Sequence, residues 1–254
     1  MPITKSLLQV MLLFCVLCGT ALAGETDEER VGNAAAAKIF GAAPLVPSAE
    51  AQRYINLVGG ALASQAGGKY LWRFGVVDSD QINAFALPGG VVLLTRGMAR
   101  LLKSEEELAF VLSHEIGHVM RQHHYRVVQR QRLAARANDA LQSVSGEGLT
   151  ELAGASAQIY ARGLDKSAEF EADRLGAQLM ASSGYDPAAA LGVLDSLLAA
   201  KNSADTKADW LFSTHPQPEQ RIDQLLAAGI ADIPAGSGVE ARRARFKAFS
   251  AMLQ

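Results

Sequence analysis

Hydrophobic residues follow two different spacings along this chain, and each spacing predicts a different kind of element. After Ser48, which is a suitable N-cap, apolar side chains recur every three or four residues until Gly67, as on the buried face of a helix. Three short runs rich in β-branched and aromatic residues follow, separated by polar or glycine-containing turns. Residues 70–77, 82–87 and 91–95 are therefore predicted to form a small sheet.

Helical spacing returns after residue 103 and dominates the rest of the chain. Ser104-Glu105-Glu106-Glu107 has the form of a capping box, in which the serine hydroxyl accepts from the Glu107 amide and the Glu107 side chain reaches back. The predicted helix continues to at least His123. Further helical segments are predicted at 152, 166–181, 187–200, 218–228 and 242–253. The predicted fold class is α+β and mostly helical.

The predicted elements divide the chain into four parts. Residues 48–230 form one domain, and residues 231–254 form a helical tail at the C-terminus. Residues 24–47 are polar, then alanine-rich, then marked by two prolines, and they predict a flexible lead-in. Residues 1–23 are predicted to be a signal peptide.

The signal peptide is predicted from a positive residue and an apolar run, followed by Ala21-Leu22-Ala23, whose small side chains a signal peptidase accepts. Both cysteines, Cys15 and Cys18, lie in this segment, so the predicted mature chain contains none. The predicted location is the periplasm. A lipid anchor on Cys18 is the alternative.

Composition limits the classes of function. The chain is 49% hydrophobic and 20% charged, which excludes a disordered or collagen-like protein. It has 24 basic and 26 acidic residues and a net charge of -2, so it lacks the basic field that binds nucleic-acid phosphates. Nucleic acid is therefore not an expected partner.

The most specific chemical signal is His114-Glu115-Ile116-Gly117-His118, which falls inside the helix predicted from the capping box. Two histidines four residues apart lie on one helical face, so both imidazoles can reach a single Zn²⁺. Glu115 is then placed to act as a general base on a water at the metal. The motif predicts one zinc ion per chain, with a third protein ligand from another segment.

A second acidic helix offers candidates for the third ligand. Glu169 and Asp173 lie one turn apart on the same predicted face, whereas Glu171 points elsewhere. One carboxylate would bind zinc, and the other would accept the N–H of a ligating histidine. The alternative is an ordinary solvated acidic face. Coupling to the histidine pair favours the metal site.

Several motifs occur together in one order. They are Asn83-Ala84-Phe85-Ala86-Leu87-Pro88-Gly89-Gly90, Thr95-Arg96-Gly97, the histidine motif with Glu107-Leu108-Ala109 before it, Glu169-x-Glu171-Ala172-Asp173 and Ser213-Thr214-His215-Pro216. With these motifs the chain resembles the HtpX-like and CAAX-prenyl-protease-like zinc metalloendopeptidases, and in particular their soluble periplasmic branch. The resemblance covers residues 54–228. It implies a zincin-type domain with a small sheet beside the active-site helix, and Glu169 as the third zinc ligand. Asp165-Lys166 replaces the usual Ser-Arg, which puts the local contacts there in question.

His215 belongs to one of these shared motifs, and two functional interpretations stay open. It occupies the open metal position at rest, or it donates to the oxyanion that develops during cleavage. Arg221 is a second candidate for stabilising that charge. Loop packing and helix solubility are the structural alternatives for the two residues. His123 and His124 lie too far along the helix to reach the same metal, and we expect both at the surface.

Two further segments have candidate roles around the site. Residues 83–95 predict a hairpin, and an edge strand of this hairpin beside the site would also pair with an extended substrate. A weak pattern at 138–149 predicts a flexible excursion. This stretch is one candidate gate, and His215, on a loop after the polar segment at 202–209, is the other.

These observations favour a zinc-dependent endopeptidase of the bacterial cell envelope that hydrolyses peptide bonds of unfolded or misassembled proteins. A chaperone-like or latent zinc protein, which binds such proteins with little cleavage, is the alternative. A metal-free helical scaffold is the third hypothesis. The expected partners are polypeptide substrates, with peripheral association with the membrane or with assembly machinery as a further expectation.

Overall fold

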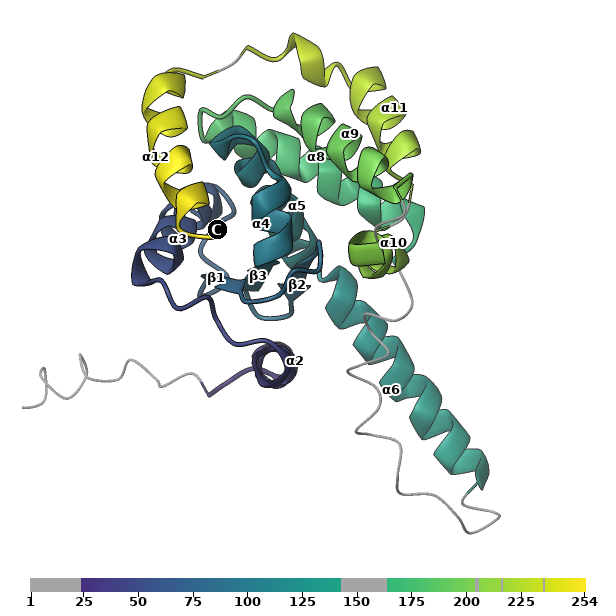
Figure 1. The fold of residues 1–254 in the computed structure, drawn as a ribbon. Coiled ribbons are helices and arrows are strands. Elements are labelled where there is room, and N and C mark those ends of the chain that lie inside the picture. Colours follow the sequence, from purple (N-terminus) through teal and green to yellow (C-terminus); the bar gives the residue numbers. More distant parts are fainter. Residues whose placement is uncertain (1–23, 143–163, 204–205, 216, 235) are drawn as a thin grey trace, which may run out of the picture.

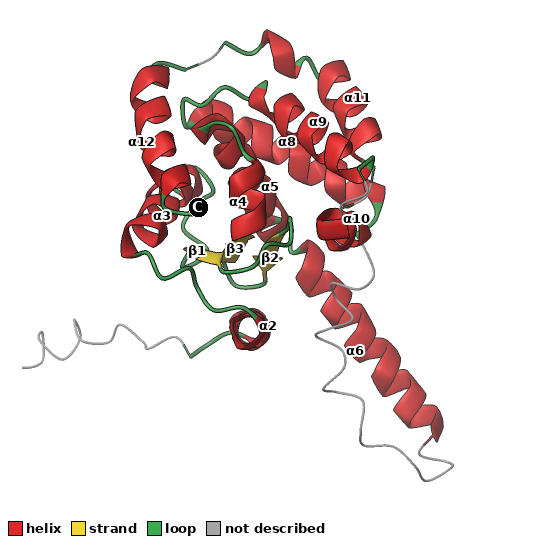
Figure 2. Cartoon of the chain, in the orientation of Figure 1, coloured by secondary structure: helices red, strands yellow, loops and turns green. Residues whose placement is uncertain are grey.

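The computed structural model describes residues 24–142, 164–203, 206–215, 217–234 and 236–254. Its elements are α2 Asp27–Ala42, α3 Ala49–Ala63, β1 Arg73–Val77, β2 Ala84–Leu87, β3 Val91–Thr95, α4 Arg96–Leu101, α5 Glu105–Met120, α6 His123–Gln142, α8 Lys166–Ser182, α9 Ala189–Lys201, η1 Thr206–Ala208, α10 Asp209–Thr214, α11 Pro218–Ala227, η2 Ile230–Asp232 and α12 Val239–Ala251. Helices surround a small sheet (Figures 1 and 2), which confirms the predicted mostly helical α+β fold. The predicted signal peptide, including Cys18, lies outside the described residues, as do residues 143–149 of the predicted excursion and the helical segment expected at residue 152.

The sheet has the strand order β1-β3-β2. β2 and β3 form the predicted hairpin, in which Leu87 is paired with Val91, while β1 runs parallel to β3. β2 is thus at an edge of the sheet. Both faces are covered: alternate strand residues pack in the core with α5, and the others pack against α2. This two-sided burial is why every residue of β2 and β3 is apolar except Thr95, the last residue of β3.

α5 is the central helix of the molecule. Every residue from Glu105 to Val119 is buried, because α5 contacts α3, α8, α9 and the sheet. The Ser104 hydroxyl accepts from the Glu107 amide at 3.1 Å, as predicted. The Glu107 carboxylate, however, accepts from the Lys103 amide at 2.6 Å instead of reaching back to Ser104. Together these two hydrogen bonds fix the backbone direction of the residues just before α5.

Two glycines let α5 and α8 approach closely. A Cβ on Gly117 would lie 3.2 Å from the Ala172 backbone, and a Cβ on Gly176 would lie 3.1 Å from the His114 backbone nitrogen. Backbone atoms cannot move aside as a flexible side chain can, so larger residues at these two positions would push the helices apart. The glycine inside the histidine motif thus has a packing role.

Over residues 24–47 the structure differs from the expected flexible lead-in, because α2 occupies most of the segment. Thr26 and Glu29 form a capping box, with the Glu29 amide donating to Thr26 Oγ1 at 3.2 Å and the Thr26 amide donating to Glu29 Oε2 at 2.8 Å. Val31 and neighbouring alanines pack on the sheet. A strong cap and small residues of high helix propensity explain the difference.

The helix that begins after Ser104 ends earlier than predicted. α5 stops at Met120, and Gln122 adopts a left-handed conformation with a φ of 56° before α6 begins at His123. The Gln122 side chain donates to Glu28 Oε2 of α2 at 2.6 Å. α6 then leaves the helical body (Figure 1). The change of direction matters for the residues that follow it.

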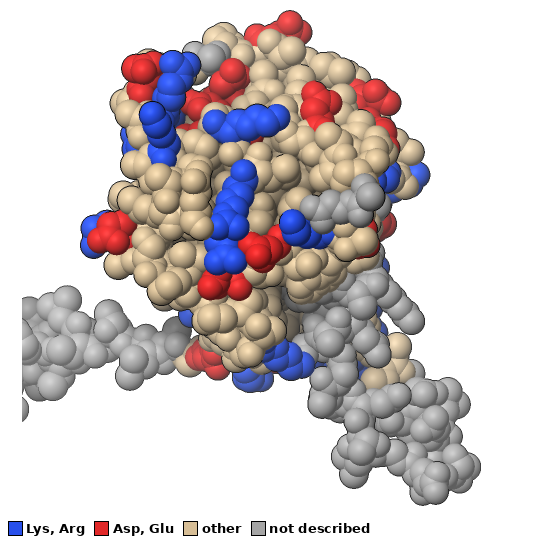
Figure 3. Space-filling view, viewed as in Figure 1, with Lys and Arg blue, Asp and Glu red and all other residues tan. Residues whose placement is uncertain are grey.

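Basic and acidic side chains lie next to one another on the face drawn in Figure 3. Within the described part of the chain, no helix is both long enough and apolar enough to cross a membrane.

Candidate metal centre

α5 presents His114, Glu115 and His118 in the interior of the molecule. The Nε2 atoms of His114 and His118 lie 2.9 Å apart, as expected for side chains stacked one turn apart on a helical face. Both imidazoles are buried, with exposed side-chain fractions of 6% and 0%. Burial lowers the pKa of His118 well below its usual range, so this ring is neutral and able to bind a metal.

α8 contributes Glu169 to the same cluster. Its carboxylate oxygens lie 3.7 Å from His114 Nε2 and 3.5 Å from His118 Nε2. Asp165 is the N-cap of α8, and its side chain accepts from the Ala168 amide at 2.9 Å. A residue that departs from the usual motif thus caps the helix. Burial opposes ionisation of Glu169, but His215 and then Arg221 hold its pKa below the ordinary value.

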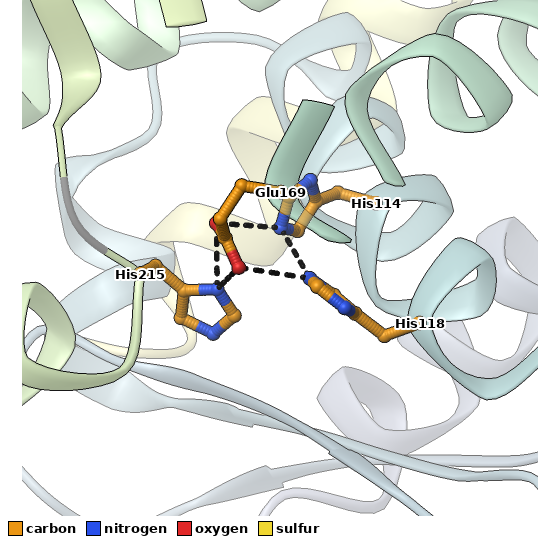
Figure 4. Close-up of side chains that lie close together, drawn as sticks. All are labelled: His114, His118, Glu169 and His215. Carbon is orange, nitrogen blue, oxygen red and sulfur yellow. Dashed lines mark hydrogen bonds and ion pairs between the residues drawn. The ribbon is translucent and has the colours of Figure 1, made fainter. Parts of the chain in front are cut away.

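His215 completes the cluster from the end of α10. Its Nδ1 lies 3.1 Å from each oxygen of Glu169, and its Nε2 lies 3.8 Å from Glu115 Oε1. Figure 4 shows the four side chains converging from α5, from α8 and from the end of α10. One ligand atom from each of His114, His118, Glu169 and His215 lies within 4.8 Å of every other.

The donor set fits zinc. Nitrogen and carboxylate oxygen atoms at about 2.1 Å from a tetrahedral zinc lie about 3.4 Å from one another. The separations from Glu169 to the histidine nitrogens, between 3.1 and 3.7 Å, are close to this edge length. Three imidazoles and one carboxylate are also ligands that zinc accepts.

Glu115 lies beside the cluster. Its Oε2 is buried and has no hydrogen-bond partner among the described residues. Burial raises the pKa of Glu115, as it does for carboxylates that act as general acids or bases near neutral pH. A buried acceptor without a partner next to a metal site requires a functional explanation, and a reacting water provides one.

Asp173 and Arg221 lie behind His114. His114 Nδ1 donates to Asp173 Oδ1 at 2.8 Å, which leaves Nε2 facing the cluster. Arg221 Nε and Nη2 donate to the two oxygens of Asp173 at 2.8 and 2.7 Å, and Arg221 Nη1 lies 3.4 Å from Glu169. Asp173 thus contacts the ring of His114, and the Arg221 guanidinium is directed to two carboxylates.

The expectation that His123 and His124 lie at the surface is wrong. Their exposed fractions are 7% and 4%. The left-handed turn at Gln122 changes the chain direction, so that His123 folds back and its Nδ1 lies 2.9 Å from His118 Nδ1. Neither glycine nor proline marks this turn. Sequence reasoning therefore extended the helix, and on an extended helix both histidines would have pointed away.

Glu171 is the other residue whose contact was missed. It points away from the Glu169 face, as expected, but its Oε2 lies 3.2 Å from His123 Nε2. Its Oε1 forms an ion pair with Arg121 Nε at 2.9 Å. The histidine motif is thus connected to the surface of the molecule through His123 and Glu171.

A small apolar cavity opens beside Glu115. Its lining comes from β2, α4, α5, α9, α10 and α11 and consists of Ala84, Met98, Phe110, Val111, His114, Glu115, Val193, Leu197, Leu211, His215 and Arg221. The edge strand β2 therefore lies next to the cluster, as the substrate-pairing interpretation of the hairpin requires.

Comparison with known proteins shows that the chain is similar to metallopeptidases. The sequence model of peptidase family M48 matches residues 49–228. The beta-barrel assembly-enhancing protease of Escherichia coli (strain K12) is 33% identical over 211 residues, which cover 77% of this chain and 42% of that protein. The corresponding protein of Yersinia pestis is 34% identical over 207 residues, with the same coverage. The mitochondrial metalloendopeptidase OMA1 of Arabidopsis thaliana is 31% identical over 160 residues, which cover 63% of this chain and 32% of that protein. The matched region spans less than half the length of these relatives.

Proposed function

The chain belongs to peptidase family M48, and from this premise we propose that it is a zinc-dependent endopeptidase of the bacterial cell envelope that cleaves unfolded or misassembled proteins. The family agrees with the metalloendopeptidase resemblance of the sequence motifs. The observation that carries the proposal is the buried cluster of His114, His118 and Glu169 with Glu115 beside it.

His114, His118 and Glu169 would hold the metal. When bound, zinc lowers the pKa of a water and polarises the peptide carbonyl. Asp173 accepts a hydrogen bond from His114 Nδ1 and so keeps His114 Nε2 available for the metal. Arg221 holds Asp173 with two hydrogen bonds and lies close to Glu169, which supports a positioning role for this arginine beside the expected role on the oxyanion.

Glu115 would act as the general base. It takes a proton from the attacking water and later delivers that proton to the nitrogen of the leaving amine, so the water is consumed and the carboxylate is regenerated. Its Oε2, which has no hydrogen-bond partner in the described part of the chain, and its raised pKa suit both steps. The edge strand β2 would hold the substrate in extended form through backbone hydrogen bonds.

The location and the partners belong to this proposal as well. The sequence of residues 1–23 supports export to the periplasm by a signal peptide, with a lipid on Cys18 as the alternative. Two of the relatives are called beta-barrel assembly-enhancing proteases, which supports substrates from the envelope and association with the membrane or with assembly machinery.

A chaperone-like or latent zinc protein is the second candidate. The observation in its favour is His215, whose Nδ1 lies 3.1 Å from Glu169 and which can act as a fourth ligand where an active site needs an open position. Under this alternative, zinc would be bound but cleavage would be slight.

The test combines metal content with cleavage of an unfolded protein, using the full chain and its Glu115→Gln variant. We expect both proteins to bind one zinc ion and only the wild type to cleave. Zinc binding without cleavage that depends on Glu115 would favour the latent protein. A wild-type chain that binds no zinc would exclude both candidates and leave a metal-free scaffold.

A further inference from the structure

A chain of hydrogen-bonding groups runs from His118 to the surface of the molecule. His118 Nδ1 lies 2.9 Å from His123 Nδ1, and His123 Nε2 lies 3.2 Å from Glu171 Oε2. Glu171 Oε1 is in turn 2.9 Å from Arg121 Nε. His123 is 7% exposed, whereas the side chains of Glu171 and Arg121 are 33% and 43% exposed. The groups therefore form a line from the buried cluster outwards.

A bound metal would fix the direction of the two hydrogen bonds that His123 makes in this line. His118 Nε2 faces Glu169 and His114, so a bound metal requires its lone pair there and leaves the single proton of the neutral ring on Nδ1. His118 Nδ1 then donates, and His123 Nδ1 must accept. The proton of His123 is consequently on Nε2, which donates to the Glu171 carboxylate. Every other pair of neutral tautomers fails at one of the two contacts. It places two protons or two lone pairs between the Nδ1 atoms of His118 and His123, or a lone pair of His123 Nε2 against the Glu171 carboxylate.

His114 and His118 are thus held in parallel ways. His114 donates directly to Asp173, which Arg221 holds. His118 donates to a neutral imidazole, which donates to Glu171, which Arg121 holds. In each case the far end is a carboxylate paired with an arginine. Partners of this kind orient a ligating ring and fix its tautomer.

We propose that His123 is a positioning residue for the metal centre. It accepts a hydrogen bond from His118 Nδ1 and so directs His118 Nε2 towards the zinc, while Glu171 holds His123 in the required tautomer. The inference rests on the proposed function only for the presence of zinc. It assigns a role to the turn at Gln122, because a straight helix would carry His123 away from His118.

The test compares zinc affinity in the full chain for two substitutions of similar size at one position. In His123→Asn the amide oxygen can still accept from His118, whereas in His123→Leu nothing can. We expect His123→Leu to weaken zinc binding about 10- to 100-fold, as removal of an outer hydrogen-bond partner does. We expect His123→Asn to stay within about threefold of the wild type, because the acceptor is kept. A competing chelator measures both, and the absorption of the Co²⁺ forms shows whether the geometry changes.

A second pair at Glu171 avoids the buried position. Glu171→Gln keeps an oxygen acceptor for His123, and Glu171→Leu removes it. We expect a loss of zinc affinity of about tenfold for Glu171→Leu and a smaller one for Glu171→Gln. Both variants change a partly exposed side chain, so loss of folding does not obscure the comparison.

Nitrogen-15 NMR of the zinc-loaded wild type tests the tautomers without any substitution. We expect the protons on Nδ1 of His118 and on Nε2 of His123. A proton on Nδ1 of His123, or equal zinc affinity and equal Co²⁺ spectra for His123→Leu and His123→Asn, would overturn the proposal. Failure of the proposed function would show differently, as a wild type that binds zinc but does not cleave.

Discussion

At the residue scale, the buried carboxylates of Glu115 and Glu169 lie near each other but differ in their neighbours. Burial raises the pKa of Glu115, whose Oε2 has no partner among the described residues. Glu169 is equally buried, but His215 and Arg221 outweigh the burial and keep it ionised. An ionised carboxylate suits a metal ligand, and one that takes up a proton more easily suits a base. The environment thus separates the two roles.

The choice of Glu169 as a ligand gives a direct prediction. Glu169→Ala should lose stoichiometric zinc, because no other carboxylate oxygen lies as close to both histidine nitrogens among the described residues. Glu171→Ala should keep zinc at saturating metal, since its contact is with His123. Equilibrium dialysis against saturating zinc, followed by metal analysis, measures both. Retention by Glu169→Ala together with loss by Glu171→Ala would show that the wrong carboxylate was chosen.

His215 gives a second prediction at this scale. Its Nδ1 faces the Glu169 carboxylate within the ligand cluster, which favours the role of a resting ligand. His215→Ala should then raise the basal cleavage rate of a small unfolded substrate, because the water position becomes free. A rate about 10- to 1000-fold lower would instead assign His215 to the oxyanion. An unchanged rate with an unchanged Co²⁺ spectrum would remove it from the site.

At the element scale, the site depends on how closely α5 and α8 pack. The histidine pair comes from one helix and Glu169 from the other, so the distance between the helix axes decides whether the ligands converge. Gly117 and Gly176 set this distance. Short helix-to-helix distances of this kind need small residues at the contact.

The prediction for this contact uses two glycine-to-alanine changes. Gly176→Ala should lower the free energy of unfolding by about 1–3 kcal/mol and weaken zinc binding, because the new Cβ meets the backbone of His114. Gly60→Ala in α3 is the matched control. Its Cβ meets open space, so a gain of about 0.4–1 kcal/mol is expected. Urea unfolding measures both, and equal effects would show that the contact is not tight.

At the scale of the whole molecule, Glu105 connects three parts of the chain to the start of α5. It is fully buried and accepts from Tyr54 of α3 at 2.7 Å and from Tyr185, which follows α8, at 3.0 Å. It also forms an ion pair with Arg245 of α12. The C-terminal helix, which lies beyond the region matched by the family model, is thus anchored to the helix that carries the histidines.

Removing this carboxylate should destabilise the whole fold. Glu105→Ala leaves several donors without their acceptor and should lower the free energy of unfolding by about 2–4 kcal/mol, less than for a fully buried pair because Arg245 is half exposed. Arg243→Ala is the control on α12, since its ion pair with Glu240 is exposed, and a change within about 0.5 kcal/mol is expected. Equal unfolding midpoints for the two variants would contradict the anchoring role.

Features that depend on neighbouring residues could be predicted from the amino-acid sequence alone. The strands, the cap at Ser104 and the histidine pair on one helical face follow from periodicity and local hydrogen bonding, and the structure contains all three. The motif order also identified the family. Helix α2 was not predicted, because the polar residues and prolines of this segment indicate a flexible lead-in. The capping box and the packing of α2 on the sheet nevertheless form the helix.

Tertiary structure alone decided the contacts between groups distant in the chain. The left-handed conformation at Gln122, stabilised by Glu28 of α2, turns His123 towards His118, and nothing in the local sequence requires this. The same holds for Arg221, which reaches Asp173 only because α11 packs against α8. The direction of a helix after a turn and the partner of a buried charge depend on the packing of the whole chain. Local periodicity therefore placed His114 and His118 on one helical face, whereas only the folded molecule showed which groups contact their rings.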